Sequence, residues 1–319
     1  MKKVLVTGAT GQIGSELTLL LRKNLGSASV IAAGHIKKPD PALRESGSFH
    51  YIDCTKIDTI AELVKKYKVD TIYHLASVLS ASAEKNPQMG WRVNVNGLYN
   101  ILEVAREYGC AVFTPSSIAI FGPSTPLQNT PQDTVQRPTT IYGVTKVAGE
   151  LLCDYYFQRF GVDTRGVRYP GLISYKTPPG GGTTDYAVEI YFEAVKHKKY
   201  TCYLKAGTWL DMMYMPDALK AAIELMEADP GRLKHRNAFN VTAMSVAPET
   251  IAAEIKKLIP DFTISYKIDP LRQAIADSWP DSMDDSVSRQ EWGWKPEYDL
   301  QTMTRDIIQN ISQMLEDTS

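Results

Sequence analysis

The strongest constraint on the fold lies at the start of the chain, where glycines interrupt a short apolar segment. Val4–Val6 is apolar and β-branched, and Thr7–Gly14 then reads TGATGQIG. The first glycine permits a tight turn, the second permits close approach of a pyrophosphate, and the third lets a helix pack on the strand. Residues 12–23 then show helical periodicity. The sequence therefore predicts a strand, a turn and a helix whose N-terminus binds phosphate groups.

The remainder of the first half alternates short apolar segments with amphipathic ones. We expect strands at 4–6, 30–33, 49–52, 71–75, 111–114 and 164–169, and helices at 12–23, 59–67, 93–108 and 142–160. This alternation is typical of an α/β fold in which helices cover both faces of a doubly wound parallel sheet.

The alternation of strand-like and helix-like segments ends near residue 175, and residues 176–184 then read KTPPGGGTT. We expect a dinucleotide-binding domain over 1–175 and a smaller, mainly substrate-binding region over 176–319. Helices are expected at 185–197, 217–228, 249–258 and 300–315. A strand at 238–241 is expected to return to the large sheet, and 266–294 shows no clear pattern.

Composition favours a small-molecule ligand. Lys and Arg total 35 against 36 Asp and Glu, a formal charge of -1, so no basic field favours nucleic acid or an anionic membrane. The four cysteines form no CxxC pair and the five histidines no HxxxH pair, so we expect reduced thiols and no metal site. Without a signal peptide or a membrane span in the sequence, the expected location is the cytoplasm.

Tyr142 and Lys146 form a YxxxK spacing on a predicted helix, one turn apart on the same face. A lysine ammonium lowers the pKa of a nearby phenol, which can then remove the proton from a substrate hydroxyl as hydride leaves carbon. Ser117 follows the strand at 111–114 and is placed to hold the same oxygen. Ser117, Tyr142 and Lys146 are therefore the predicted catalytic residues, for oxidation of an alcohol.

These segments together resemble the extended short-chain dehydrogenase/reductase superfamily. The resemblance rests on TGATGQIG, His74-Leu75-Ala76-Ser77, Asn94, Pro115-Ser116-Ser117 and Tyr142-Gly143-Val144-Thr145-Lys146. It implies a Rossmann fold, selects Ser117 over Ser116, and assigns Asn94 to a water relay that supports the lysine. The implied cofactor-binding residues are Gly8, Gly11, Gln12, Ile13, His35, Asp53, Leu75, Ala76, Ser77, Asn94, Tyr142, Lys146, Tyr169 and Pro170.

The choice between NAD and NADP is less clear from the residues. An acid usually follows the second strand and excludes a 2′-phosphate, but here Ala32–Lys38 reads AAGHIKK. His35 is placed to bind the ribose, whereas Lys37 or Lys38 would favour NADP. Asp53 is a candidate partner for the adenine amino group. The resemblance implies NAD, which is the expected cofactor.

Later segments look like those of the short-chain-type L-threonine 3-dehydrogenases. They are Leu79-Ser80-Ala81, Gly180–Ala187, Met212–Ala218 and Asp277-Ser278-Trp279-Pro280. This resemblance implies oxidation of the L-threonine β-hydroxyl to 2-amino-3-ketobutyrate. The candidate substrate-binding residues are Ser80, Ser117, Tyr142, Gly182, Thr184, Asp185 and Trp279. Two simpler interpretations stay open: Thr184 and Asp185 cap the following helix, and Trp279 is ordinary core.

Two other functions remain open. One is a nucleotide-sugar epimerase or dehydratase, which the lack of an arginine in Trp209-Leu210-Asp211 disfavours, and the other is an NAD sensor without catalysis. The oligomeric state is also open between monomer and homodimer. The helices at 93–108 and 142–160 commonly form a dimer interface in the superfamily, but both carry charges here.

Overall fold

The computed structural model describes residues 1–176 and 182–316, which form two compact units. Unit 1 comprises Met1–Ile120, Pro138–Arg168 and Leu219–Phe239; unit 2 comprises Phe121–Arg137, Tyr169–Ala218 and Asn240–Ser319. Each unit is built from three separate segments of the chain. The sequence alone predicts a single domain boundary near residue 175. Residues 177–181 of the expected loop lie outside the described residues.

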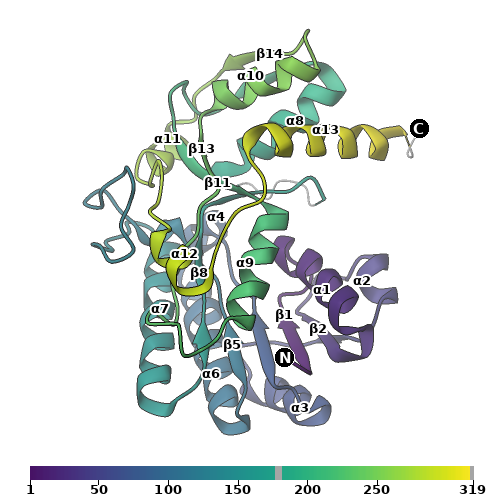
Figure 1. Ribbon diagram of the computed structural model, residues 1–319, viewed down its shortest axis with the longest axis vertical. Coiled ribbons are helices and arrows are strands. Elements are labelled where there is room, and N and C mark those ends of the chain that lie inside the picture. The colour runs from purple at the N-terminus through teal and green to yellow at the C-terminus, as the bar shows by residue number, and fades with distance from the viewer. Residues whose placement is uncertain (177–181, 317–319) are drawn as a thin grey trace. The chain divides into compact units, whose positions relative to one another are not determined.

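A six-stranded parallel sheet forms the centre of unit 1 (Figure 1), in the order β3-β2-β1-β4-β5-β7. Its strands are β1 (Val4–Thr7), β2 (Val30–Gly34), β3 (Phe49–Tyr51), β4 (Thr71–His74), β5 (Ala111–Phe113) and β7 (Thr164–Arg165). In register, Val4 of β1 pairs with Val30 on one side and Thr71 on the other. The order reverses between β1 and β4, which confirms the predicted doubly wound parallel sheet.

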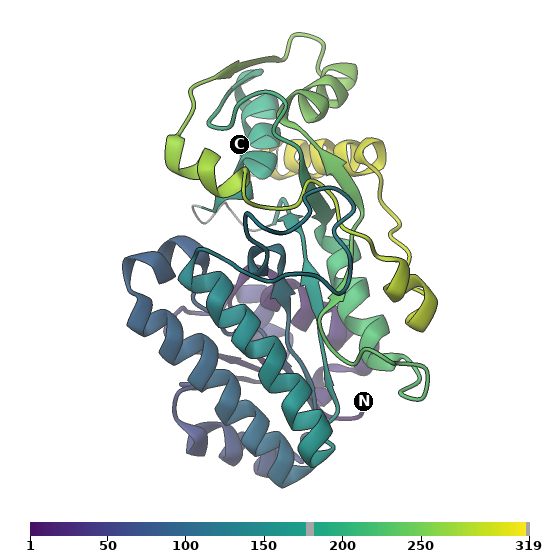
Figure 2. The same cartoon turned by 90° about the vertical axis from the view of Figure 1, so that its left-hand side faces the viewer.

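Helices cover this sheet because their apolar faces are buried against it. They are α1 (Gln12–Leu25), η1 (Ser27–Ser29), α2 (Pro41–Glu45), α3 (Ile57–Tyr67), α4 (Ser80–Lys85), α5 (Pro87–Trp91), a π-helical turn η2 (Arg92–Asn96), α6 (Gly97–Tyr108), η3 (Ile118–Ile120) and α7 (Ile141–Phe160). Figure 2 shows α6 and α7 lying side by side. Ile60, Ile101 and Cys153 from α3, α6 and α7 share one core cluster with Leu5 and Ile72 of the sheet.

The strand expected at 164–169 is broken at Gly166. A Cβ at Gly166 would lie 2.3 Å from the Thr114 carbonyl oxygen, so the backbone approaches too closely for any other residue. Beyond the break, β8 (Val167–Tyr169) joins a three-stranded sheet in the order β12-β8-β6, with β6 (Ser116–Ser117) and β12 (Phe239–Asn240). The strand expected at 238–241 therefore pairs with β8 and not with the six-stranded sheet.

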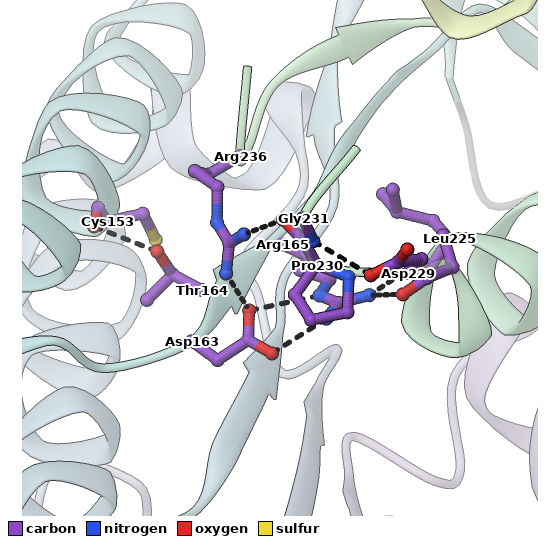
Figure 3. A network of polar contacts seen from close by, with 10 residues as sticks. Cys153, Asp163, Thr164, Arg165, Leu225, Asp229, Pro230, Gly231 and Arg236 are labelled. Atoms are coloured by element: carbon purple, nitrogen blue, oxygen red, sulfur yellow. Dashed lines mark hydrogen bonds and ion pairs between the residues drawn. The ribbon is translucent and has the colours of Figure 1, made fainter. Parts of the chain in front are cut away.

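Buried arginine contacts hold the end of α9 (Met215–Glu227) against β7 (Figure 3). Arg165 donates to the carbonyl oxygens of Leu225 and Ala228 at 2.7 and 2.8 Å. Its guanidinium also pairs with Asp163 at 2.8 Å, and Arg236 reaches the same carboxylate at 2.9 Å. Only 4% of the Arg165 side chain is exposed, so these contacts replace water that the group would otherwise bind.

We expect Arg165→Met to lower the free energy of unfolding by about 3 kcal/mol, because it removes a partner of the half-buried Asp163 and leaves two carbonyls without their donor. Thermal unfolding should show a fall in Tm of roughly 5–8 °C. Arg44→Met is the matched control, since Arg44 pairs with Glu45 at an exposed site and should cost less than about 0.5 kcal/mol. Equal Tm values for the two variants would contradict this prediction.

Unit 2 contains two small sheets and a group of helices. The strands form the orders β13-β11-β9 and β10-β14; α8, α10 and α13 pack against one another. The elements are β9 (Gly171–Ile173), η4 (Thr183–Asp185), α8 (Tyr186–His197), β10 (Lys199–Cys202), β11 (Leu210–Tyr214), β13 (Met244–Val246), α10 (Pro248–Leu258), β14 (Thr263–Tyr266), α11 (Pro270–Ala276), α12 (Ser286–Trp292) and α13 (Leu300–Glu316). In the described part of the chain, no helix is long and apolar enough to cross a membrane.

Candidate functional site

The glycine-rich turn after β1 is packed so tightly that side chains are excluded. Gly8 has φ +72°, and a Cβ there would lie 2.6 Å from the Ala76 nitrogen. A Cβ at Gly14 would lie 2.2 Å from the Gly8 carbonyl oxygen. No side chain among the described residues caps α1 at Gly11, so the N–H groups of its first turn, beginning at Gln12 and Ile13, are available to an anion. The cradle therefore fits a pyrophosphate.

A pocket of about 510 Å³ opens beside this turn at the carboxyl ends of β1, β2 and β4. Predicted cofactor-binding residues in its wall are Gly8, Gly11, His35, Asp53, Leu75, Ala76 and Ser77. Thr10, Thr55, Met89 and Arg92 also line the pocket, although no sequence pattern predicts them. Arg92 begins the π-helical turn before Asn94, and only the folded chain shows that its side chain faces this pocket.

The structure gives a reason for the missing acid after β2. Gly34 ends that strand, and a Cβ there would lie 2.9 Å from the Phe49 ring and 3.2 Å from the Thr10 methyl group. A longer side chain has no room unless both neighbours move. Asp53 supplies a carboxylate elsewhere in the pocket. Hydrogen bonds from Thr55 lower its pKa, and the nearby His35 adds to this effect, so Asp53 is anionic.

Asn94 connects two parts of the site through its side chain. Its amide oxygen accepts the Val78 N–H at 2.7 Å, and its nitrogen donates to Val78 O and to Thr145 Oγ1, both at 3.1 Å. These bonds hold the segment after β4 against α7. Two other residues predicted to bind cofactor, Tyr169 and Pro170, belong to unit 2, where the Tyr169 hydroxyl donates to the Ala218 carbonyl at 2.6 Å.

The three predicted catalytic residues are brought together in unit 1. Ser117 lies on β6, while Tyr142 and Lys146 lie on the first two turns of α7. The Ser117 side chain hydrogen-bonds to the Tyr142 hydroxyl, and its Oγ accepts the Ala119 N–H at 3.2 Å. Lys146 Nζ lies 5.5 Å from the centre of the Tyr142 ring. The two hydroxyls and the ammonium thus lie near one another, an arrangement suited to proton abstraction from an alcohol.

Burial shifts both titratable groups of this set. It raises the pKa of Tyr142 to about 12, although the hydrogen bond with Ser117 opposes the change. It lowers the pKa of Lys146 to about 8, while the negative charge of Glu150 opposes that shift. Lys146 also donates to the Pro115 carbonyl oxygen at 2.8 Å. At neutral pH Lys146 is therefore mostly cationic, and added positive charge beside Tyr142 would favour its phenolate.

The start of α7 is held from several directions, which orients Tyr142. Thr140 caps the helix by accepting the Gly143 N–H at 3.1 Å, and Glu84 of α4 accepts the Ile141 N–H at 2.6 Å. A Cβ at Gly143 would lie 2.2 Å from the Ala119 carbonyl oxygen. The helix therefore lies directly on the segment that carries Ser117, which brings the Ser117 and Tyr142 hydroxyls toward each other.

The candidate substrate-binding residues belong to both units. Ser80 begins α4 in unit 1, whereas Gly182, Thr184 and Asp185 lie together in unit 2. Asp185 accepts the Gly182 N–H at 2.7 Å, which closes the short turn η4. As far as the structure describes the chain, its side chain makes no capping bond to the following helix α8, so the expected cap of that helix is not the one found. Trp279 is buried, with 8% of its surface exposed, just after α11, which packs against η4.

Comparison with known proteins identifies the family. The NAD dependent epimerase/dehydratase family matches residues 4–242, which span most of the chain. This chain belongs to that family. Its cofactor is NAD, in agreement with the prediction and with the pyrophosphate cradle described above.

Individual relatives in the family differ in what is known of them. An uncharacterized epimerase/dehydratase of Staphylococcus aureus strain USA300 is 54% identical over 98% of both chains. The L-threonine dehydrogenase structure from Clostridium difficile is 59% identical, with a TM-score of 0.97 over 98% of both chains. A monomeric L-threonine 3-dehydrogenase from a metagenome is 46% identical, with a TM-score of 0.92 over 98% of this chain and 99% of the other. The family and these structures support an NAD-dependent oxidoreductase.

Proposed function

We propose that this protein oxidises the β-hydroxyl of L-threonine to 2-amino-3-ketobutyrate. The observation that carries the proposal is the Ser117–Tyr142–Lys146 arrangement within a chain 59% identical to an L-threonine dehydrogenase. At this identity and coverage the two chains share their architecture throughout. The arrangement supports removal of a proton from a secondary alcohol, and L-threonine supplies such an alcohol at Cβ.

In this proposal each catalytic side chain acts on the substrate oxygen or on another member of the set. Ser117 donates a hydrogen bond to the hydroxyl oxygen, and Tyr142 removes its proton. Lys146, cationic at neutral pH, stabilises the Tyr142 phenolate. Bound NAD supplies the hydride acceptor. The residues proposed to hold NAD are Gly8, Gly11, Gln12, Ile13, His35, Asp53, Leu75, Ala76, Ser77, Asn94, Tyr142, Lys146, Tyr169 and Pro170.

An amino-acid substrate also needs partners for its carboxylate, ammonium and methyl groups. We assign the carboxylate to Ser80, Thr184 and the backbone near Gly182, because hydroxyls and N–H groups are donors. Asp185 is the proposed partner of the ammonium group. The bond from the Gly182 N–H holds its carboxylate in place. Trp279 is the proposed apolar wall beside the methyl group.

The start of β11 argues against a nucleotide-sugar substrate. Trp209-Leu210-Asp211 carries no arginine for a diphosphate. Asp211 is fully buried, and its carboxylate accepts from Thr242 Oγ1 at 2.5 Å and from the Met283 N–H at 2.8 Å. Burial raises its pKa to about 8. The carboxyl group is therefore committed to bonds within unit 2, and this segment offers no cation to a diphosphate.

The test is NADH formation, followed by absorbance, with L-threonine, D-threonine, L-allo-threonine and L-serine, using NAD and NADP in parallel. We expect turnover with L-threonine and NAD. Turnover only with a UDP- or dTDP-sugar would replace the proposal by the epimerase/dehydratase alternative. NAD binding without turnover of any of these compounds would favour the sensor.

We further propose that the protein forms a homodimer through the outer face of α6 and α7. Val144, Leu151 and Tyr155 are 40%, 62% and 53% exposed on α7 and follow one helical stripe, beside exposed Tyr99 on α6. Such spacing is typical of packed helix pairs. Light scattering should give a dimer for the wild type and a monomer for Leu151→Glu. A monomeric wild type, as the metagenome relative is described, would refute the dimer.

A further inference from the structure

Two buried polar side chains near Lys146 have hydrogen-bonding capacity that the protein does not fill. His74 is 3% exposed and Ser116 7% exposed. His74 Nδ1 bonds to Thr7 Oγ1 at 2.8 Å, but neither His74 Nε2 nor Ser116 Oγ has a partner within residues 1–176 and 182–316. Buried polar atoms are nearly always hydrogen-bonded, so both atoms indicate a further partner.

Both side chains line a cavity of about 30 Å³ inside unit 1, and Lys146 lies in the same wall. A polar cavity of this size has room for one or two water molecules. The Lys146 ammonium has three N–H donors, one of which reaches the Pro115 carbonyl. Asn94 also lines the cavity, but its side chain is already bonded to Val78 and Thr145.

We propose that this cavity is an internal water site that joins His74 Nε2, Ser116 Oγ and Lys146 Nζ, and that His74 is a positioning residue for the catalytic lysine. The inference rests on the proposed function only in treating Lys146 as catalytic. In this arrangement the His74 proton lies on Nδ1 and is donated to Thr7. The Nε2 lone pair then faces the cavity and accepts a hydrogen bond from water held by the ammonium.

The charges around the cavity favour this tautomer. Burial and the Lys146 charge lower the pKa of His74 to about 3, so the imidazole is neutral and has one lone pair. A lone pair directed at an ammonium stabilises it, whereas an N–H directed at it does not. Within the described residues, the other titratable groups that act on Lys146 are Tyr142, Glu150 and Cys153 of α7. Glu150 pairs in turn with Arg168 of β8 at 2.9 Å.

The first test needs no turnover. In protein labelled with ¹⁵N-histidine, the ring-nitrogen shifts of His74, assigned by their loss in His74→Gln, report its tautomer. We expect a neutral ring with the proton on Nδ1 between about pH 6 and 9. The Nε2 resonance should move in Lys146→Met and in Ser116→Ala, but not in Lys65→Met, which changes an exposed lysine. A proton on Nε2 would overturn the proposal. So would an Nε2 chemical shift that is the same in Lys146→Met and Ser116→Ala as in the wild type.

The second test uses turnover. His74→Phe removes the acceptor and fills the cavity, so Lys146 should lose its proton more readily. The alkaline limb of the kcat profile should move down by roughly one pH unit, the size expected for one hydrogen bond. The KM for NAD should change less than twofold. His74→Gln, which keeps a polar group, should recover most of the shift.

His50→Phe is the matched control, because His50 pairs with Tyr67 on β3 and α3, outside the cavity. A folded His74→Phe with the wild-type pH profile would refute the positioning role. If the wild type oxidises no alcohol at all, the proposed function fails, and the ¹⁵N shifts still decide whether the water site exists.

Discussion

Tyr142→Phe should lower kcat by at least about 10³-fold, because the proposed mechanism assigns removal of the substrate proton to the phenol. The substitution deletes one oxygen and leaves the ring that lies beside Lys146, so packing at the start of α7 is kept. NADH binding, measured by fluorescence titration, should change less than about threefold, equivalent to under 1 kcal/mol. Steady-state kinetics with L-threonine measure the first effect.

Tyr108→Phe is the control for this result, since Tyr108 is a 37% exposed tyrosine at the end of α6. It should retain wild-type kcat. In the wild type, activity should rise with pH as Tyr142 ionises, because burial raises its pKa to about 12 and positive charge beside it must lower that value. A Tyr142→Phe enzyme with wild-type kcat would end the catalytic assignment.

Gly8→Ala should be the most disruptive single change in the cofactor site. Alanine is disfavoured at φ +72°, and its Cβ would lie 2.6 Å from the backbone of Leu75 and Ala76. We expect a loss of about 3 kcal/mol in the free energy of unfolding, from the strained φ and the overpacking together. The Kd for NAD should rise by roughly 10- to 100-fold, because the turn and the segment after β4 must move apart.

Gly109→Ala separates the two causes. Gly109 has φ +70°, almost the same as Gly8, but a Cβ there would meet nothing within 4 Å. The variant should cost about 1 kcal/mol, from backbone conformation alone, and leave the Kd for NAD unchanged. Denaturant unfolding and isothermal titration of both variants provide the measurement. Equal effects at Gly8 and Gly109 would show that the close approach at Gly8 is unimportant.

Much of the fold could be predicted because it depends on local patterns. The strands and helices of the parallel sheet, such as α1 and α3, follow from apolar periodicity and from glycines at chain reversals. The region 266–294 could not be assigned, and it holds the short helices α11 and α12. Helices of this length have little intrinsic stability, so packing within unit 2 determines them.

Spacing along one helix predicted Tyr142 and Lys146 as catalytic residues, and the short sequence after β5 predicted Ser117. Sequence patterns assigned no role to His74 beyond its place in a family motif, and Ser116 was set aside in favour of Ser117. In the part of the chain that the structure describes, each has a buried polar atom without a hydrogen-bond partner, and both side chains line the cavity beside Lys146. Arg92 likewise has no signal in the sequence, because the residues around a helix start do not indicate which pocket its side chain will line.

The glycine-rich turn, the order of strands and helices, and the spacing of Tyr142 and Lys146 could be read from the sequence, because each depends on neighbours within a few residues. The tertiary structure alone decided the break at Gly166, the pairing of β12 with β8, and the cavity shared by His74, Ser116 and Lys146. These features depend on close contacts between segments far apart in the chain, where tenths of an ångström decide which atoms meet.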